Sequence, residues 1–174
     1  MKAKFHKTKT GIYPYNRKKA YRYAEKWALK RNPKYYNFDY LGGDCTNFAS
    51  QVLFAGGCPM NYKKWIGWYY KNINKRAASW TGVNFLYDFL ITNKDRGPIA
   101  EETSIDKIQI GDIIQLNFDL DNSFNHTPIV VKIDEPRMEN NIYIAAHTID
   151  RFNYSLGKYK YKDIRYLHII GYRY

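Results

Sequence analysis

The first half of the chain carries apolar residues at the three- and four-residue spacing of amphipathic helices. This pattern predicts helices over residues 16–32, 44–56 and 83–91, with a loop between the last two. Asn16 can cap the first helix, and glycine pairs stand near both ends of the second. The second helix is apolar on nearly all of its inner side, so we expect it to lie at the centre of the fold.

Beyond Gly97-Pro98 the apolar period changes to two, which is typical of strands. Strands are expected over residues 113–118, 129–133, 142–147 and 164–170. Helices followed by strands predict an α+β fold with an antiparallel sheet. No repeat, linker or shift in composition divides the chain. Residues 15–174 are therefore expected to form a single domain, preceded by a basic arm of residues 1–14.

The composition is that of a folded globular protein, with 174 residues of which 45% are hydrophobic and 25% charged. No apolar stretch reaches the roughly 20 residues that cross a bilayer, and residues 1–11 lack the apolar region of a secretory signal. Lys and Arg number 28 against 16 Asp and Glu, a net charge of +12. This charge favours an anionic partner such as teichoic acid, nucleic acid or an acidic membrane surface.

Cys45 stands in the run G-G-D-C-T-N-F-A-S-Q, at the first turn of the second predicted helix. Unpaired backbone N–H groups and the helix dipole favour a thiolate at that position. The same N–H groups can stabilise the oxyanion that forms when a thiolate attacks a carbonyl. The alternative is that Cys45 is a small buried apolar residue, as most free cysteines are. We interpret Asp44 as the capping residue of this helix and Cys58 as structural.

A cysteine that attacks amides needs a histidine to exchange its proton and a further group to orient that histidine. His126 opens one predicted strand and His147 ends the next. If these strands pair antiparallel, the two histidines become neighbours at one end of the sheet. His6 lies in the polar arm, and His168 is interpreted as a core histidine bonded to a backbone carbonyl.

Other signals carry less weight. A metal site formed by Cys45, His126 and His147 matches no compact zinc motif. No P-loop, dinucleotide-binding fingerprint or nucleic-acid recognition motif accompanies the positive charge. Neither a cofactor nor a metal is therefore expected, and nucleic acid is not the favoured partner. An aromatic stretch could stack on sugars or peptides, but packing is the favoured role for its members Trp65, Trp68, Tyr69, Tyr70 and Trp80.

Four motifs in order, D-C-T-N-F, G-D-I-I-Q-L, N-H-T-P-I-V-V and I-Y-I-A-A-H-T, resemble those of bacterial papain-like cell-wall hydrolases, the NlpC-type and CHAP-type cysteine amidases and endopeptidases. A closer resemblance is to the bacterial family described as a putative amidase domain. It rests on Y-N-R-K-K-A-Y-x-Y-A, N-P-x-Y, G-G-D-C-T-N-F-A-S-Q, A-G-G and S-W-T-G-V. The resemblance covers the chain from about Tyr15 to Leu156.

The resemblance implies a circularly permuted papain-like core, in which N-terminal helices pack on a C-terminal antiparallel sheet. It assigns Cys45 as nucleophile, His126 as general base and acid, and His147 as the orienting group. This sequence departs from the NlpC-type pattern in two places. D-C-T-N replaces D-C-S-G, and the segment between His126 and His147 is longer than a tight hairpin. Asp150, in H-T-I-D, is therefore an alternative orienting residue.

Together these observations predict a cysteine-dependent amidase or peptidase that hydrolyses an amide bond, most naturally in bacterial peptidoglycan. A protein or isopeptide substrate would use the same chemistry. The alternative is a non-catalytic binding module of the same fold that adheres to an anionic cell-wall polymer or to nucleic acid. A peptidoglycan substrate predicts a secreted or cell-wall-associated protein, with no transmembrane segment and no signal peptide in the chain as given.

Overall fold

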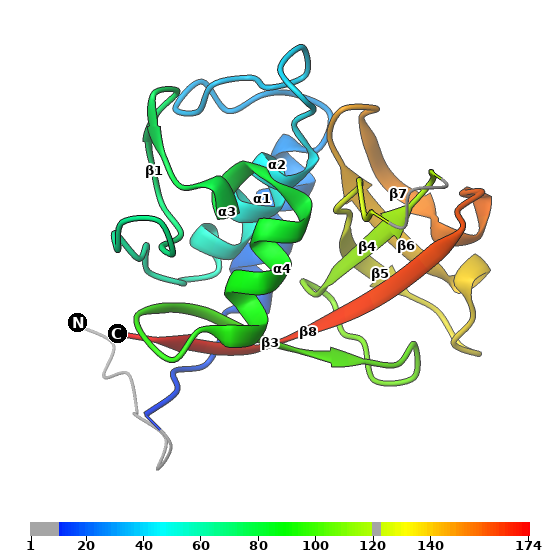
Figure 1. The fold of residues 1–174 in the computed structure, drawn as a ribbon. Coiled ribbons are helices and arrows are strands. Elements are labelled where there is room, and N and C mark those ends of the chain that lie inside the picture. The colour runs from blue at the N-terminus through cyan, green and yellow to red at the C-terminus, as the bar shows by residue number, and fades with distance from the viewer. Residues whose placement is uncertain (1–10, 120–122) are drawn as a thin grey trace.

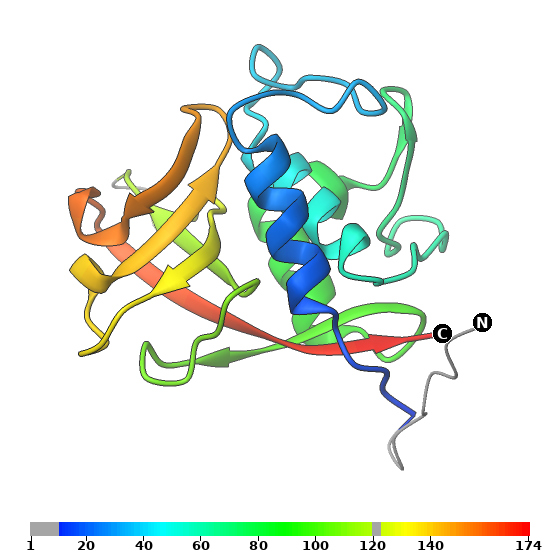
Figure 2. The same ribbon diagram turned by 180° about the vertical axis from the view of Figure 1, so that it is seen from behind.

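The helices of the protein gather on one side and most of its strands on the other, in a computed structural model that describes residues 11–119 and 123–174 (Figure 1). Helix α2 (Cys45–Ala55) lies between α1 (Arg17–Trp27) and the pair formed by α3 (Ala78–Thr81) and α4 (Val83–Thr92). Figure 2 shows α1 from behind, where it covers α2. The predicted helices are all present, and the fold is α+β, as expected.

Local sequence signals set the ends of α1 and α2. The side chain of Asn16 accepts a hydrogen bond from the backbone N–H of Lys19 at 2.9 Å, which confirms the predicted N-cap of α1. Helix α1 ends at Trp27, one turn before the predicted stop. Helix α2 ends at Gly56, and its residues from Cys45 to Leu53 are all buried. This burial confirms its predicted place at the centre of the fold.

Six antiparallel strands form the main sheet, in the order β3-β8-β4-β5-β6-β7. Its members are β3 (Gly97–Thr103), β4 (Ile113–Asn117), β5 (Ile129–Ile133), β6 (Ile142–Ala146), β7 (Arg151–Ser155) and β8 (Asp163–Arg173). The four predicted strands correspond to β4, β5, β6 and β8. The remaining strands β3 and β7 form the two edges of the sheet. Shorter elements are β1 (Tyr70–Asn72), β2 (Lys75–Arg76), η1 (Glu139–Asn141) and η2 (Leu156–Lys158).

Successive residues of the central strands face two separate apolar clusters, as the pleat of a strand requires. The helix-side cluster joins the helices to one face of the sheet and includes Phe48, Val52, Leu86, Ile113, Ile129, Ala145 and Leu167. The far-side cluster covers the other face and includes Ile114, Leu116, Val130, Ile144, Ala146 and Leu156. Both faces of the sheet are therefore buried. The long strand β8 contributes to both clusters, with Leu167 on the helix side and Ile164 on the far side.

The N-terminal arm is only partly described. Residues 1–10, with His6, lie outside the described residues, whereas Tyr13 forms a two-hydrogen-bond bridge with Tyr172 of β8. Of the aromatic stretch, Trp68 and Trp80 are fully buried, while Trp65 is 87% exposed. Within residues 11–119 and 123–174, no helix has both the length and the apolar character needed to cross a bilayer.

Candidate active site

Cys45 is the first residue of α2 and is 6% exposed. The chain reaches it through Gly42 and Gly43, which have φ values of 87° and 96°. Side chains rarely adopt such values, so glycine is needed for the turn that leads into the helix. The first backbone N–H groups of α2 have no partner within the helix and point towards its start. The predicted placement of Cys45 at a helix N-terminus is confirmed.

The side chain of Asp44 is bound away from the backbone of α2, so its predicted capping role is wrong. Its Oδ1 accepts hydrogen bonds from the backbone N–H of Phe38 at 2.9 Å and from Asn47 Nδ2 at 2.8 Å. Its Oδ2 lies 2.6 Å from His147 Nδ1 and 3.4 Å from Arg31 Nε. Asp44 is fully buried and joins the loop before α2 to the strand that ends at His147.

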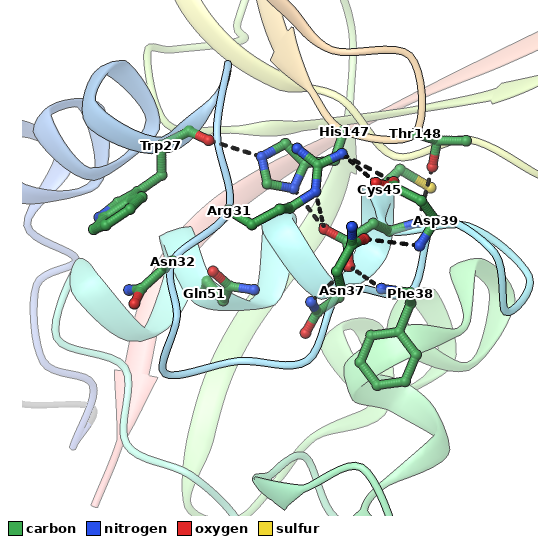
Figure 3. Close-up of polar contacts among 12 residues, drawn as sticks. Trp27, Arg31, Asn32, Asn37, Phe38, Asp39, Cys45, Gln51, His147 and Thr148 are labelled. Atoms are coloured by element: carbon green, nitrogen blue, oxygen red, sulfur yellow. Dashed lines mark hydrogen bonds and ion pairs between the residues drawn. The ribbon is translucent and has the colours of Figure 1, made fainter.

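His147 is fully buried, and both of its ring nitrogens have partners (Figure 3). Nδ1 contacts the Asp44 carboxylate, and Nε2 lies 2.8 Å from the backbone oxygen of Trp27. The Asp44 carboxylate and the Trp27 oxygen are both hydrogen-bond acceptors, so the ring is held between two acceptors. The ring also stacks on Phe48 at 4.0 Å. His147 therefore links α1, α2 and β6.

The expected contact between His147 and His126 is not formed, and the sheet register explains why. Ile129 of β5 pairs with Ala145 of β6, so the same register sets His147 opposite Thr127. His126 pairs with Leu116, which belongs to the far-side cluster, whereas Ala145 belongs to the helix-side cluster. A shift of one residue moves a side chain to the other face of a sheet. The sequence-based pairing of the two histidines was wrong by that one residue.

Asp150, the alternative orienting residue, is bound to Arg31. Two hydrogen bonds of 2.7 and 2.9 Å join the Arg31 guanidinium to the Asp150 carboxylate. Two more, also of 2.7 and 2.9 Å, join it to Asp39 (Figure 3). Arg31 thus fastens the loop before Cys45 to the turn after β6. Neither group predicted to orient His126 is directed towards it.

His126 lies just before β5 and is 8% exposed. Burial lowers the pKa of its imidazole to about 4, so the ring is neutral at pH 7. Its Nε2 lies 3.4 Å from the hydroxyl of Tyr159, and the ring is flanked by Phe118 and Tyr159 at centroid distances of 5.8 and 5.7 Å. Tyr159 follows η2, in a segment that the sequence analysis did not connect with the site.

The segments that carry Cys45 and His126 meet through their next residues. The hydroxyl oxygens of Thr46 and Thr127 lie 3.1 Å apart in a buried contact. Burial raises the pKa of the Cys45 thiol, although the Thr46 hydroxyl and the backbone N–H of Thr127 both act to lower it. The expectation that the helix start favours a thiolate is therefore corrected, because burial outweighs these hydrogen bonds. At pH 7 the structure favours a neutral Cys45 thiol and a neutral His126 imidazole, on segments that meet at Thr46 and Thr127.

A hollow of about 440 Å³ opens beside His126. Tyr159 and Arg151 line it, and the remaining lining residues are Phe118, Asp119, Asn125, His126, Thr148 and Ile149. Arg151 also raises the local positive potential, since it acts to lower the pKa of Tyr159. Most of the wall is apolar, and the charged side chains in it are those of Arg151 and Asp119.

The remaining candidate residues lie elsewhere. Cys58 is 1% exposed within the helix-side cluster, and burial raises the pKa of its thiol, as expected for a structural cysteine. His168 Nδ1 lies 2.8 Å from Asp112 Oδ2, so its predicted backbone partner is replaced by a carboxylate. Among the residues that the structure describes, no three His, Cys, Asp or Glu side chains gather as metal ligands would.

Three residues of the site were missed by sequence reasoning. Thr127 stands directly after His126, and a polar β-branched residue at that point was a usable signal. Arg31 stands near the end of the first predicted helix and Tyr159 in a basic, tyrosine-rich run, and nothing in the sequence distinguished either from a solvated residue. Their roles follow from contacts with residues far away in the chain.

Sequence similarity to known proteins covers most of the chain. The chain is 38% identical to "Uncharacterized protein YhbB" of Bacillus subtilis (strain 168) over 140 residues, which are 79% of this chain and 43% of that protein. It is 29% identical to "Uncharacterized protein YjcM" of the same organism over 156 residues, 84% of this chain and 34% of that protein. The chain thus spans less than half the length of these relatives.

No solved structure matches the chain. The family model described as "Putative amidase domain" matches residues 14–170, a span that contains the whole helical layer, the strands through most of β8 and every site residue described above. The chain belongs to this family of amidase domains.

Proposed function

We propose that this domain is a cysteine-dependent amidase with a papain-like core, related to the NlpC-type and CHAP-type cell-wall hydrolases, and that residues 15–174 form its single catalytic domain. The observation that carries the proposal is the buried contact between Thr46 and Thr127. It brings the cysteine at the start of a helix next to the segment of a neutral histidine. Family membership supports amide hydrolysis as the reaction.

In the proposed reaction, the Cys45 sulfur attacks the carbonyl carbon of the amide while His126 accepts the thiol proton. The negative charge then develops on the carbonyl oxygen, where backbone N–H groups at the start of α2 stabilise it. His126 gives its proton to the departing amine, which leaves a thioester on Cys45. Water, deprotonated by His126, attacks the thioester and releases the carboxylic acid and the thiol.

Because the Cys45 thiol and the His126 imidazole are both neutral, His126 must remove the thiol proton during the reaction. Since burial disfavours both the thiolate and the imidazolium, the ion pair forms only as the substrate arrives. Substrate in the hollow beside His126 would exclude water and supply the electrophile. His126 therefore acts as a general base in the first step.

Peptidoglycan is the proposed substrate, and the proposed location is outside the cell or in the wall. The net charge of +12 supports binding to a wall rich in anionic polymers. The amide-bearing peptides of the wall are uncharged for short stretches and carry carboxylates, which the apolar hollow and Arg151 could accommodate.

The test is digestion of purified peptidoglycan followed by mass spectrometry of the soluble products. We expect fragments that have gained one water across an amide bond with the wild-type protein and with Cys58→Ala. No such fragments are expected with folded Cys45→Ala. Hydrolysis by Cys45→Ala would remove the nucleophile assignment, and wild-type binding without any cleavage would favour a binding module.

A further inference from the structure

His126 needs a partner that fixes its ring, and Tyr159 is the group in place. The Tyr159 hydroxyl lies 3.4 Å from Nε2, and the two rings are tilted by 56° at a centroid distance of 5.7 Å. Catalytic hydrogen bonds are often long before substrate binds and shorten in the reacting complex. The contact at Nε2 leaves Nδ1 as the ring nitrogen that can exchange a proton with Cys45.

We propose that Tyr159 is the positioning residue that orients His126, in the role expected of His147 or Asp150. This proposal rests on the proposed function. If the phenol oxygen accepts a hydrogen bond from Nε2–H, the proton of the neutral ring stays on Nε2. Nδ1 then presents its lone pair to the thiol, and the same Nε2–H bond strengthens once the ring becomes positively charged.

The surroundings of Tyr159 hold its hydroxyl in place. Its backbone N–H donates to the oxygen of Leu156 at 3.0 Å, which closes the single turn of η2. Its ring packs edge-on against Tyr154 at 5.4 Å and tilted against Phe118 at 5.8 Å. These contacts come from three segments, so the phenol is held by packing and has little freedom to turn away from His126.

A phenol suits this site better than a carboxylate. Burial raises the pKa of Tyr159 to about 12, and the Cys45 thiol adds to the rise, so the phenol is neutral when the enzyme works. It can orient the ring without adding a negative charge beside the developing thiolate. The other charged or titratable groups near the Tyr159 phenol are Asp119 and Arg151 in the hollow, Tyr154 against its ring and Cys45 at the helix start.

The test replaces the phenol oxygen alone. Tyr159→Phe keeps the ring and its packing, and we expect kcat to fall about tenfold, the value of one hydrogen bond, with KM little changed. The imidazolium loses its acceptor, so the acidic limb of the pH profile of kcat/KM should move to lower pH. Tyr154→Phe is the matched control, and it should keep the wild-type rate and profile.

A second readout needs no substrate. Histidine side-chain ¹⁵N chemical shifts should place the proton of neutral His126 on Nε2 in the wild type and in Tyr154→Phe. In Tyr159→Phe the shifts should instead show a mixture of the two neutral tautomers, with the proton exchanging between Nε2 and Nδ1. Unchanged shifts and an unmoved acidic limb in Tyr159→Phe would reduce Tyr159 to a packing residue. Because the shifts are measured without turnover, they decide the role of Tyr159 even if the protein cleaves no amide.

Discussion

The Thr46 and Thr127 hydroxyl oxygens lie 3.1 Å apart, and this contact joins the first turn of α2 to the residue that follows His126. Thr46 also lies beside the thiol, with its hydroxyl 3.8 Å from Cys45 Sγ. Gln115 Nε2 reaches Thr127 Oγ1 at 3.5 Å from β4. The separation of the segments that carry Cys45 and His126 thus depends on a buried polar contact between two elements that are far apart in the chain.

Thr127→Val should show how much the contact between the two hydroxyls contributes to stability, because valine keeps the shape of the side chain and removes only the hydroxyl. We expect the free energy of unfolding to fall by about 1–3 kcal/mol, since the Thr46 hydroxyl loses a buried partner. Activity should fall as well. Thr46→Val and the double variant complete a cycle measured by urea denaturation. Additive losses in that cycle would show that the two hydroxyls do not interact.

His147 is expected to act on stability and not on chemistry. His147→Gln breaks a fully buried contact with the Asp44 carboxylate, so the free energy of unfolding should fall by about 3 kcal/mol. Asp44→Asn, which removes the other partner, should cost a similar amount. Under conditions where both variants are folded by circular dichroism, each should keep a measurable kcat. A folded, stable His147→Gln protein without activity would instead return His147 to the catalytic group.

His126 gives the stability a defined pH dependence. The pKa of the His126 imidazole is about 4 in the folded protein, against 6.5 ordinarily. Between pH 6.5 and pH 4, His126 is therefore protonated in the unfolded chain but not in the folded protein. The free energy of unfolding therefore falls as pH falls through this window, by up to about 3 kcal/mol. Urea denaturation at several pH values should show a shallower decline for His126→Gln. Parallel wild-type and variant curves would contradict the neutral, buried ring.

The two glycines of the turn before Cys45, Gly42 and Gly43, allow a matched pair of alanine substitutions. Both glycines have positive φ, but a Cβ on Gly42 meets nothing within 4 Å, whereas one on Gly43 would lie 3.1 Å from Thr148 Oγ1. That hydroxyl accepts the backbone N–H of Asp44 at 2.8 Å. Gly42→Ala should cost about 1 kcal/mol from backbone strain alone. Gly43→Ala should cost more and lower activity, and equal thermal shifts in the two variants would show that the Thr148 contact is unimportant.

The sequence was a good guide to the buried helices and central strands, whose apolar residues pack into the two clusters. It failed at β3 and β7, because an edge strand such as Arg151–Ser155 is defined by its single neighbour and not by its own alternation. At the site, a helix start identified Cys45 and a strand start identified His126. The group that orients His126 could not be predicted from the sequence. Its identity depends on the register of the sheet and on the position that Tyr159, after η2, takes in the folded protein.

Strand β8 is the last element of the described chain, yet it lies between β3 and β4. Until β8 has been synthesised, β3 has no partner strand and β4 has one unpaired edge, and neither apolar cluster is complete. Folding of the sheet is therefore non-local and slow relative to that of the helices. A nascent chain would expose strand edges that attract chaperones or other chains. The sheet beside which His126 lies therefore becomes complete only after β8 has been synthesised.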